Sequence, residues 1–215
     1  MLFRSDRAVR RAAAEALGKL GDPQAIPALI KALRDDWDAV RRAAAEALMK
    51  IGTPAVPALI QALGHYWYDV RCAAAEALVK IGTPAVPALI KALGDSDSAV
   101  RRAAAEALGK LGDPQAVSAL IQALGDSGWK VRFAAAEALG KLGDLQAVPP
   151  LIKALGYWRS ENVRRAAAEA LGKLGDPQAV PALIQALGDD EFWVRCAAQQ
   201  AIQQIQTKQS QTKRP

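Results

Sequence analysis

Residues 163–188 read VRRAAAEALGKLGDPQAVPALIQALG, and the chain returns to close copies of this stretch along most of its length. The Val-Arg pair that opens the stretch recurs at Val9, Val40, Val70, Val100, Val131, Val163 and Val194. The spacings between these copies are 31, 30, 30, 31, 32 and 31 residues. A fixed period of this length is typical of stacked supersecondary units, so the repeat is a better guide to the architecture than the total length.

Each copy is expected to contain two amphipathic helices. In the first copy, one set of apolar residues falls on a single helical face, and a second set does so after a break. The two sets are Val9, Ala13, Ala16, Leu17 and Leu20, followed by Ile26, Leu29, Ile30 and Leu33. The pattern therefore predicts a pair of helices in every repeat.

The break between the two helices reads Gly21-Asp22-Pro23-Gln24 in the first copy. Glycine can end the first helix, and the Asp-Pro pair can start the second. In two copies the break shortens to GTP, at residues 52–54 and 82–84, which accounts for the two 30-residue periods.

The segment DPQAVPALIQALGD at 176–189, together with VRRAAAEALGKLG at 163–175, resembles the HEAT-like repeat of the phycobilisome-lyase type. The same pattern underlies the artificial HEAT-like repeat proteins known as alphaReps. The resemblance implies an all-α fold, a right-handed α-solenoid of about six and a half HEAT-like helix pairs that form a curved rod. We expect residues 1–206 to form this single solenoid domain and residues 207–215 to form a flexible polar, basic tail.

The resemblance also implies a role for the arginine of each Val-Arg pair. Each would pair with the aspartate of the preceding turn inside a repeat, so that a ladder of ion pairs forms along the solenoid. The arginines are Arg10, Arg41, Arg71, Arg101, Arg132, Arg164 and Arg195, and the aspartates are Asp22, Asp113, Asp144 and Asp176. Thr53 and Thr83 stand in the aspartate position of two copies, so we expect the ladder to be interrupted there.

The two ends of the array differ in polarity. The last Val-Arg helix carries Gln199, Gln200, Gln203 and Gln204, which would form a polar cap on an exposed terminal repeat. The first helix has no such changes. Leu2 stands seven residues before Val9, as Leu33 at the end of a predicted helix stands seven residues before Val40. We therefore expect that the array begins inside a longer one, or that association masks this end.

Nine of the eleven aromatic residues lie in the short loops between repeats, away from the expected core positions. Five of the six loops contain an aromatic residue, whereas the loop at 94–99 contains none although it joins the same two helices. The loops are 34–39 (RDDWDA), 64–69 (GHYWYD), 94–99 (GDSDSA), 125–130 (GDSGWK), 156–162 (GYWRSEN) and 188–193 (GDDEFW). The fold therefore does not require these rings, and Tyr and Trp are enriched at recognition surfaces.

Two tryptophans also replace residues that would stabilise a helix. Trp37 and Trp67 stand three residues before a repeat valine, in the position where Asp6 and Asp97 are expected to be helix N-caps. Loss of such a cap typically costs about 1 kcal/mol. Tryptophan at this position thus indicates selection for something other than stability.

A second variable position follows each Val-Arg pair and includes Cys72 and Phe133. We expect this position and the loops to form one continuous surface. The candidate partner-binding residues are Trp37, His65, Tyr66, Trp67, Tyr68, Cys72, Trp129, Phe133, Tyr157, Trp158, Arg159, Phe192 and Trp193.

Catalytic, metal-binding and cofactor-binding signatures are not found in the sequence. His65 is the only histidine, and a contact role is favoured over a catalytic one. Cys72 and Cys196 stand four repeats apart, too far for a disulfide. Glu15 falls between Arg11 and Lys19 in an i, i+4 row that indicates surface pairing, and the row recurs in later repeats. We therefore expect no catalytic residue, no metal and no cofactor. We also expect that the protein is not an enzyme, except under the lyase alternative given below.

Charge and hydropathy favour a protein that works in the cytoplasm. The formal net charge is +6, but Lys208, Lys213 and Arg214 contribute half of it, so nucleic acid is disfavoured as a partner. No apolar run is long enough to span a bilayer, and no membrane partner is expected.

Three functions remain. The favoured one is a protein-binding repeat scaffold, natural or engineered, that recognises another protein through its aromatic loops and the adjacent starts of the Val-Arg helices. The resemblance suggests a bilin lyase or chromophore-handling subunit as an alternative. The other alternative is a self-assembling structural repeat protein, in which a second copy of the chain forms a homodimer.

Overall fold

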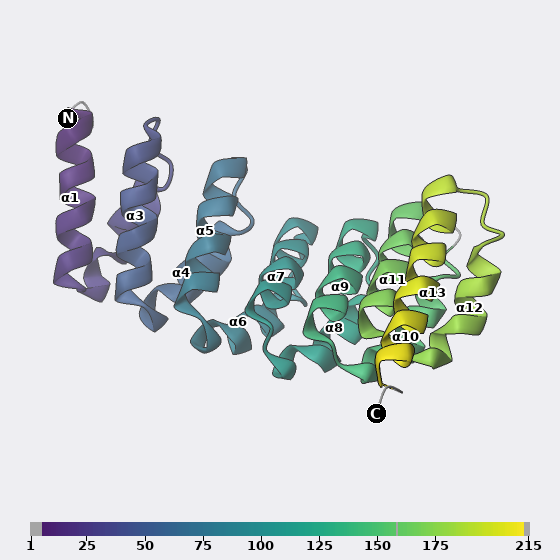
Figure 1. Ribbon diagram of the computed structural model, residues 1–215. Coiled ribbons are helices and arrows are strands. Elements are labelled where there is room, and N and C mark those ends of the chain that lie inside the picture. The colour runs from purple at the N-terminus through teal and green to yellow at the C-terminus, as the bar shows by residue number, and fades with distance from the viewer. Residues whose placement is uncertain (1–5, 158, 213–215) are drawn as a thin grey trace. The chain divides into compact units, whose positions relative to one another are not determined.

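The computed structural model describes residues 6–157 and 159–212, and within them the chain is all α, with short 3₁₀ turns between helices (Figure 1). It divides into two compact units, residues 1–107 and 108–215, and the boundary falls inside one helix, α7. The repeat pattern predicts a single domain over residues 1–206, and this single domain remains a prediction.

The first unit contains six complete helices and most of α7. Its helices are α1 (Arg7–Leu20), α2 (Ile26–Ala32), α3 (Asp38–Ile51), α4 (Val56–Ala62), α5 (Tyr68–Ile81), α6 (Val86–Ala92) and α7 (Ser98–Leu111). Helices α1, α3 and α5 pack side by side in sequence order, and α2, α4 and α6 form the second layer (Figure 1). This is the arrangement expected for stacked helix pairs.

The second unit repeats the same plan. Its helices are α8 (Val117–Ala123), α9 (Trp129–Leu142), α10 (Val148–Ala154), α11 (Glu161–Leu174), α12 (Val180–Ala186) and α13 (Phe192–Thr212). Helix α11 packs against both α9 and α13. Helix α13 continues to Thr212, so part of the segment expected to be a flexible tail is helical.

The turn inside the first repeat follows the predicted chemistry. Gly21 ends α1 in the left-handed conformation, with φ of 66°, which glycine adopts without steric cost. The Asp22 side chain then accepts a hydrogen bond from the backbone N–H of Gln24. The second helix of the pair begins as a 3₁₀ turn, Pro23–Ala25, before it becomes α-helical, a detail that the apolar spacing did not predict.

The core consists of leucine, valine and alanine at the predicted positions. Leu48, Leu59 and Leu78 are completely buried, as are their equivalents in the second unit. Small residues let the helices approach closely: a Cβ added to Gly18 would lie 2.7 Å from Ala47 Cα. This spacing explains why alanine and glycine dominate the helix faces.

The first repeat departs from the predicted burial. Val9 is 56% exposed, whereas the equivalent Val40 is 1% exposed. Ala13, Ala16 and Leu20 are also exposed. Val9 and Ala13 line an open apolar hollow together with Ala28 and Leu29 of α2. The glutamines of α13, Gln199, Gln200, Gln203 and Gln204, are exposed as expected of a polar cap.

No single described helix is both long and apolar enough to cross a membrane; two sharply bent helix pairs, 38–62 and 68–92, pass such a test by length and composition alone.

Candidate functional site

The loops between repeats are held in place by arginines from the helices that follow them. Arg71 Nη1 donates to the carbonyl oxygens of His65 and Tyr66, both at 2.8 Å. Arg41, Arg101, Arg132 and Arg195 make the same pair of hydrogen bonds to residues six and five positions earlier. These five loops are therefore held in the same way, whatever side chains they carry. In the longer loop at 156–162, Arg164 Nη1 instead donates to the carbonyl of Tyr157, seven positions earlier.

This arrangement corrects the expected arginine ladder. The turn aspartates Asp22, Asp113, Asp144 and Asp176 each accept a hydrogen bond from the backbone N–H two residues later. None of them forms an ion pair with a repeat arginine within the described part of the chain. A short aspartate side chain is satisfied locally by its own turn, and the longer arginine reaches the loop between repeats instead.

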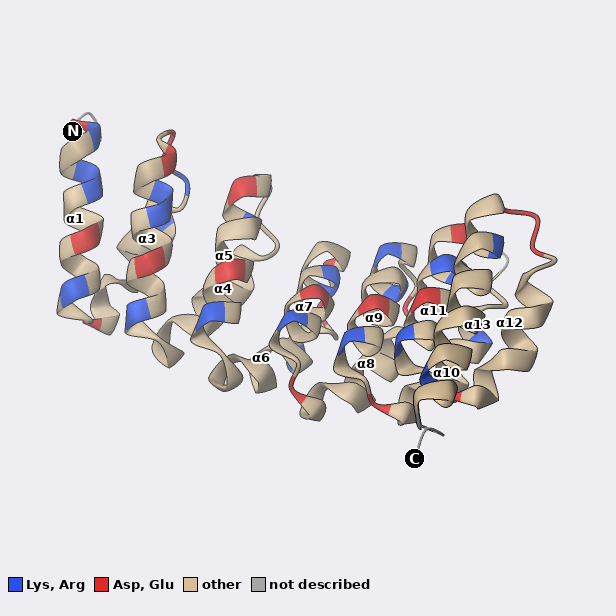
Figure 2. Ribbon diagram, in the orientation of Figure 1, with Lys and Arg blue, Asp and Glu red and all other residues tan. Residues whose placement is uncertain are grey.

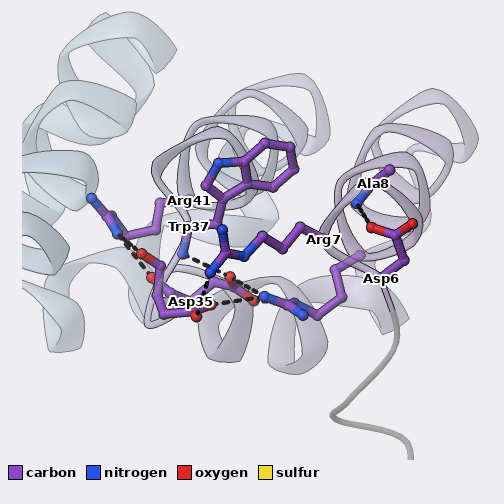
Figure 3. A network of polar contacts seen from close by, with 8 residues as sticks. Asp6, Arg7, Ala8, Asp35, Trp37 and Arg41 are labelled. Atoms are coloured by element: carbon purple, nitrogen blue, oxygen red, sulfur yellow. Dashed lines mark hydrogen bonds and ion pairs between the residues drawn. The ribbon is translucent and has the colours of Figure 1, made fainter.

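Arg10 and Arg164 also reach forward, each to the loop that follows its own helix pair. Arg10 Nε and Nη2 bind the two carboxylate oxygens of Asp35 at 2.7 and 2.8 Å, and Arg164 binds Asp189 in the same way. The Arg10 guanidinium lowers the pKa of Asp35 to about 2. Burial opposes the ionisation of Asp189, but the hydrogen bond from Arg164 helps to give a net lowering of its pKa. Figure 3 shows the first of these loops, with Asp35, Trp37 and Arg41 together and Arg7 reaching toward them from α1.

The second residue of each of five loops accepts a hydrogen bond from the backbone N–H two residues later. Aspartate does this at positions 35, 95, 126 and 189. In the loop at 64–69 the acceptor is His65 Nδ1, which lies 3.1 Å from Trp67 N. Burial, reinforced by the positive charges of Arg34 and Arg71, lowers the pKa of His65 and so favours the neutral ring that can accept this bond. His65 is thus a structural member of its loop.

The helix caps follow the sequence prediction. Asp6 and Asp97 accept hydrogen bonds from the backbone N–H groups of Ala8 and Ala99. Trp37 and Trp67 occupy the N-cap positions of α3 and α5 without any side-chain cap bond. These helices therefore lack a stabilising interaction that α1 and α7 possess.

In the first unit, three aromatic side chains of one loop line a cleft of about 430 Å³ between the loops at 34–39 and 64–69. Tyr66, Trp67 and Tyr68 line the cleft and are 90, 53 and 66% exposed. The remaining lining residues are Asp35, Arg41, Asp69 and Val70. Trp37 is half-buried and does not line the cleft. The sequence did not identify Asp35, Arg41 or Asp69 as candidate binding residues, although all three lie in or beside the variable loops.

The candidate residues of the second unit form smaller groups. Phe192 and Trp193 are exposed and meet edge to face at 5.1 Å, and Trp129 is exposed beside Lys130. Tyr157 is half-buried, and its hydroxyl donates to the carbonyl of Leu124 at 3.0 Å, so this ring connects two loops. Arg159 is exposed, and Trp158 lies outside the described residues. One continuous surface across all loops remains a prediction.

The second variable position is less exposed than the loops. Cys72 and Phe133 are half-buried, and Cys72 and Cys196 are free thiols. Cys72 lies one turn after Tyr68, and the nearby thiol raises the pKa of the Tyr68 hydroxyl.

The charged rows on the helices are surface pairs, as expected (Figure 2). Arg11 pairs with Glu15 and Arg102 with Glu106, both at 3.0 Å, whereas Arg42 pairs with Asp38 at 2.8 Å in place of Glu46. Within the described residues, no group of three His, Cys, Asp or Glu side chains is placed to hold a metal ion.

The repeat geometry agrees with the comparison to known families. The family described as HEAT repeats matches residues 1–66, 40–95, 56–128, 86–157 and 148–212. The chain belongs to the HEAT-repeat family, and its fold is an all-α solenoid. A comparison with curated protein sequences finds none that matches.

Among solved structures, this chain is similar to human deoxyhypusine hydroxylase in complex with glycerol. The identity is 29%, the TM-score 0.52, and the alignment covers 95% of this chain and 82% of that one. It is also similar to the complex of CpcE and CpcF of phycocyanin lyase from Nostoc sp. PCC7120, with 28% identity, a TM-score of 0.64, and coverage of 69 and 98%. The karyopherin Kap121p, bound in one structure to the extreme C-terminus of the protein phosphatase Cdc14p, shares the fold at 16% identity, a TM-score of 0.68, and coverage of 91 and 28%.

Proposed function

We propose that this HEAT-repeat protein is a scaffold that binds a partner protein through its aromatic loops and the adjacent starts of the Val-Arg helices. The observation that carries the proposal is the loop at 64–69. Tyr66, Trp67 and Tyr68 are exposed there, while Arg71 holds the backbone beneath them with two short hydrogen bonds.

Exposed rings on a rigid loop are suited to recognition. A tyrosine or tryptophan contributes a large contact area and has few rotatable bonds to immobilise. Because the loop backbone is already tied to its helix, less conformational entropy is lost when a partner binds. A ring whose only role was to cover the core would be buried, and Tyr66 is 90% exposed.

The comparison with the phycocyanin lyase supports this class of function. That structure is a complex of two proteins, CpcE and CpcF, and its chain is covered almost completely by the similarity to this one. The HEAT-repeat framework of this chain is therefore suited to holding a second protein.

The chain supplies its own control for a test. We would replace residues 64–69 (GHYWYD) by the sequence of the loop at 94–99 (GDSDSA), which has the same length and the same arginine contacts. Circular dichroism should show unchanged helix content, and the replaced chain should fail to capture a specific protein that the unchanged chain captures. If capture is unchanged, this loop is not the binding site; if the protein unfolds, the rings cover the core.

A bilin-handling role is a second candidate, because the chain is 28% identical to a phycocyanin lyase chain. Incubation with a bilin, followed by gel filtration, would show visible absorbance that moves with the protein. The same experiment on Cys72→Ser would test whether that thiol contributes. Absence of absorbance in the protein peak would remove this candidate.

Self-association is the third candidate. The exposed rings and the exposed apolar face of α1 could each be covered by a second copy. Light scattering on a sizing column over a hundredfold concentration range separates the cases. A mass near 22.8 kDa throughout leaves the loops free for another protein, and a dimer favours self-recognition.

A further inference from the structure

The cleft between the loops at 34–39 and 64–69 has chemical features that favour one kind of occupant. Its volume of about 430 Å³ is at the lower end of the range for ligand pockets, roughly 300 to 1,000 Å³. It therefore accommodates a side chain better than a whole helix. Tyr66, Trp67 and Tyr68 line it, and the faces of such rings carry negative electrostatic potential.

Arg41, the basic lining residue, is already occupied by contacts within the protein. Its Nη1 donates to the carbonyls of Asp35 and Asp36 at 2.9 and 3.3 Å. Its Nη2 lies 3.3 Å from both Asp38 Oδ1 and Asp69 Oδ2. With these four acceptors around it, Arg41 is a poor receptor for an acidic group from outside.

The two acidic lining residues differ in their availability. Asp35 binds Arg10 through both oxygens, and the pKa of its carboxyl is held at about 2. The side chain of Asp69 is 65% exposed, and its Oδ2 lies 3.3 Å from Arg41. This carboxylate can therefore accept further hydrogen bonds from a ligand in the cleft.

We propose that this cleft receives an arginine side chain of the partner protein. The guanidinium would stack on the rings of the 64–69 loop, and Asp69 would accept its N–H groups. This inference rests on the proposed function, and it specifies the chemistry of the partner at one site.

Arginine fits a cleft that combines aromatic rings with a carboxylate better than other side chains do. Its planar guanidinium both stacks on aromatic rings and forms directed hydrogen bonds to carboxylates, whereas lysine is a compact, strongly hydrated charge. The chain itself uses the same contact: the guanidinium carbons of Arg71, Arg132 and Arg195 lie 5.5, 5.5 and 5.8 Å from the ring centroids of Tyr68, Tyr157 and Phe192.

The test is an NMR titration of the full chain with the blocked tripeptide acetyl-Gly-Arg-Gly-amide at millimolar concentration. The matched control peptide replaces arginine by citrulline, which has nearly the same shape and no charge. We expect the arginine peptide to shift the Trp67 indole N–H signal, assigned with a Trp67→Phe variant, and the citrulline peptide to shift it much less.

Two variants locate the interaction. Asp69→Asn should weaken binding of the arginine peptide about threefold, as expected for one exposed charge pair. Asp97→Asn, on the loop without aromatic residues, should leave binding unchanged. Equal shifts with arginine and citrulline, or equal effects of the two variants, would overturn the inference, as would preferential binding of a glutamate peptide.

The outcome separates this inference from the proposed function. If replacement of the loop abolishes partner capture but the arginine peptide does not bind, the loop recognises a protein by other chemistry and only the arginine proposal fails. If the peptide binds and capture is unaffected by the loop replacement, the cleft exists but is not where the partner docks.

Discussion

The loops at 64–69 and 94–99 join equivalent helices in the same compact unit, yet they present different surfaces. In both, the arginine of the following helix holds two loop carbonyls, and the first polar residue accepts a bond from the N–H two residues later. One then displays three aromatic rings, and the other displays only aspartate and serine. The comparison shows that the backbone of the loop is maintained by the framework and leaves the outward side chains free to vary.

The largest expected difference is in the free energy of unfolding, between a substitution in the helical framework and one in the loop. Leu78→Ala removes a completely buried side chain from α5 and should lower the free energy of unfolding by about 2 to 5 kcal/mol. Tyr66→Ala should change it by less than about 0.5 kcal/mol, because the ring is 90% exposed. Urea unfolding measures both. A large loss with Tyr66→Ala would mean that the ring supports the fold.

The next largest effect concerns the arginine that holds the loop. Arg71→Ala leaves the His65 and Tyr66 carbonyls without their charged donor and should cost about 1.5 to 3 kcal/mol. Faster amide hydrogen exchange confined to residues 64–69 would show that the loop itself has loosened. If exchange in this loop stays as slow as in the loop at 94–99, the guanidinium is not what holds it.

A smaller effect follows from the helix cap. Trp67→Asp gives α5 the capping residue that α7 has in Asp97, whose carboxylate accepts a bond from Ala99 N at 2.8 Å. We expect stability to rise by about 1 kcal/mol and partner binding to fall. Thermal unfolding and capture of the partner, measured on the same sample, give the two readouts. A variant that gained stability and kept full binding would contradict the recognition role of this ring.

The smallest expected effect is a pH dependence of folding stability. It arises from His65, which stands where the loop at 94–99 has Asp95. Because the pKa of His65 is lowered in the folded protein, the unfolded chain binds more protons as the pH falls below about 6.5. The stability that neutral His65 contributes is therefore present above that pH and is lost as the pH drops through the folded pKa. The loss should be below about 1 kcal/mol, since one hydrogen bond to Trp67 is involved.

His65→Asp is the matched control for this dependence, because aspartate accepts the same bond in four other loops. The variant should show a flatter stability profile between pH 7 and pH 5 in urea unfolding at several pH values. Parallel profiles for the two proteins would show that protonation of His65 does not affect folding.

Several elements could be derived from local sequence patterns. The helix pairs follow from apolar spacing, the turn at 21–24 follows from glycine and Asp-Pro chemistry, and the missing caps at Trp37 and Trp67 follow from their position before each repeat valine. These features depend on residues within about one helical turn of each other, and such interactions are readable along the chain.

Other features were missed because they join residues that are distant in sequence. Arg10 reaches Asp35 over 25 positions, and the arginines bind loop carbonyls instead of turn aspartates. Main-chain acceptors leave no mark in the sequence, since every residue has one. The cleft was also missed, because its lining comes from two loops that pack together only after their helices have stacked.

The sequence by itself determined that the chain is a HEAT-type repeat of paired helices, which residues vary between copies, and that most of the variable rings lie in loops. Only the tertiary structure decided which rings are exposed, how arginines hold the loops, and that Tyr66, Trp67, Tyr68 and Asp69 share one cleft. The physical reason is that periodicity and capping are local, whereas burial and side-chain partners depend on how the helices of successive repeats pack.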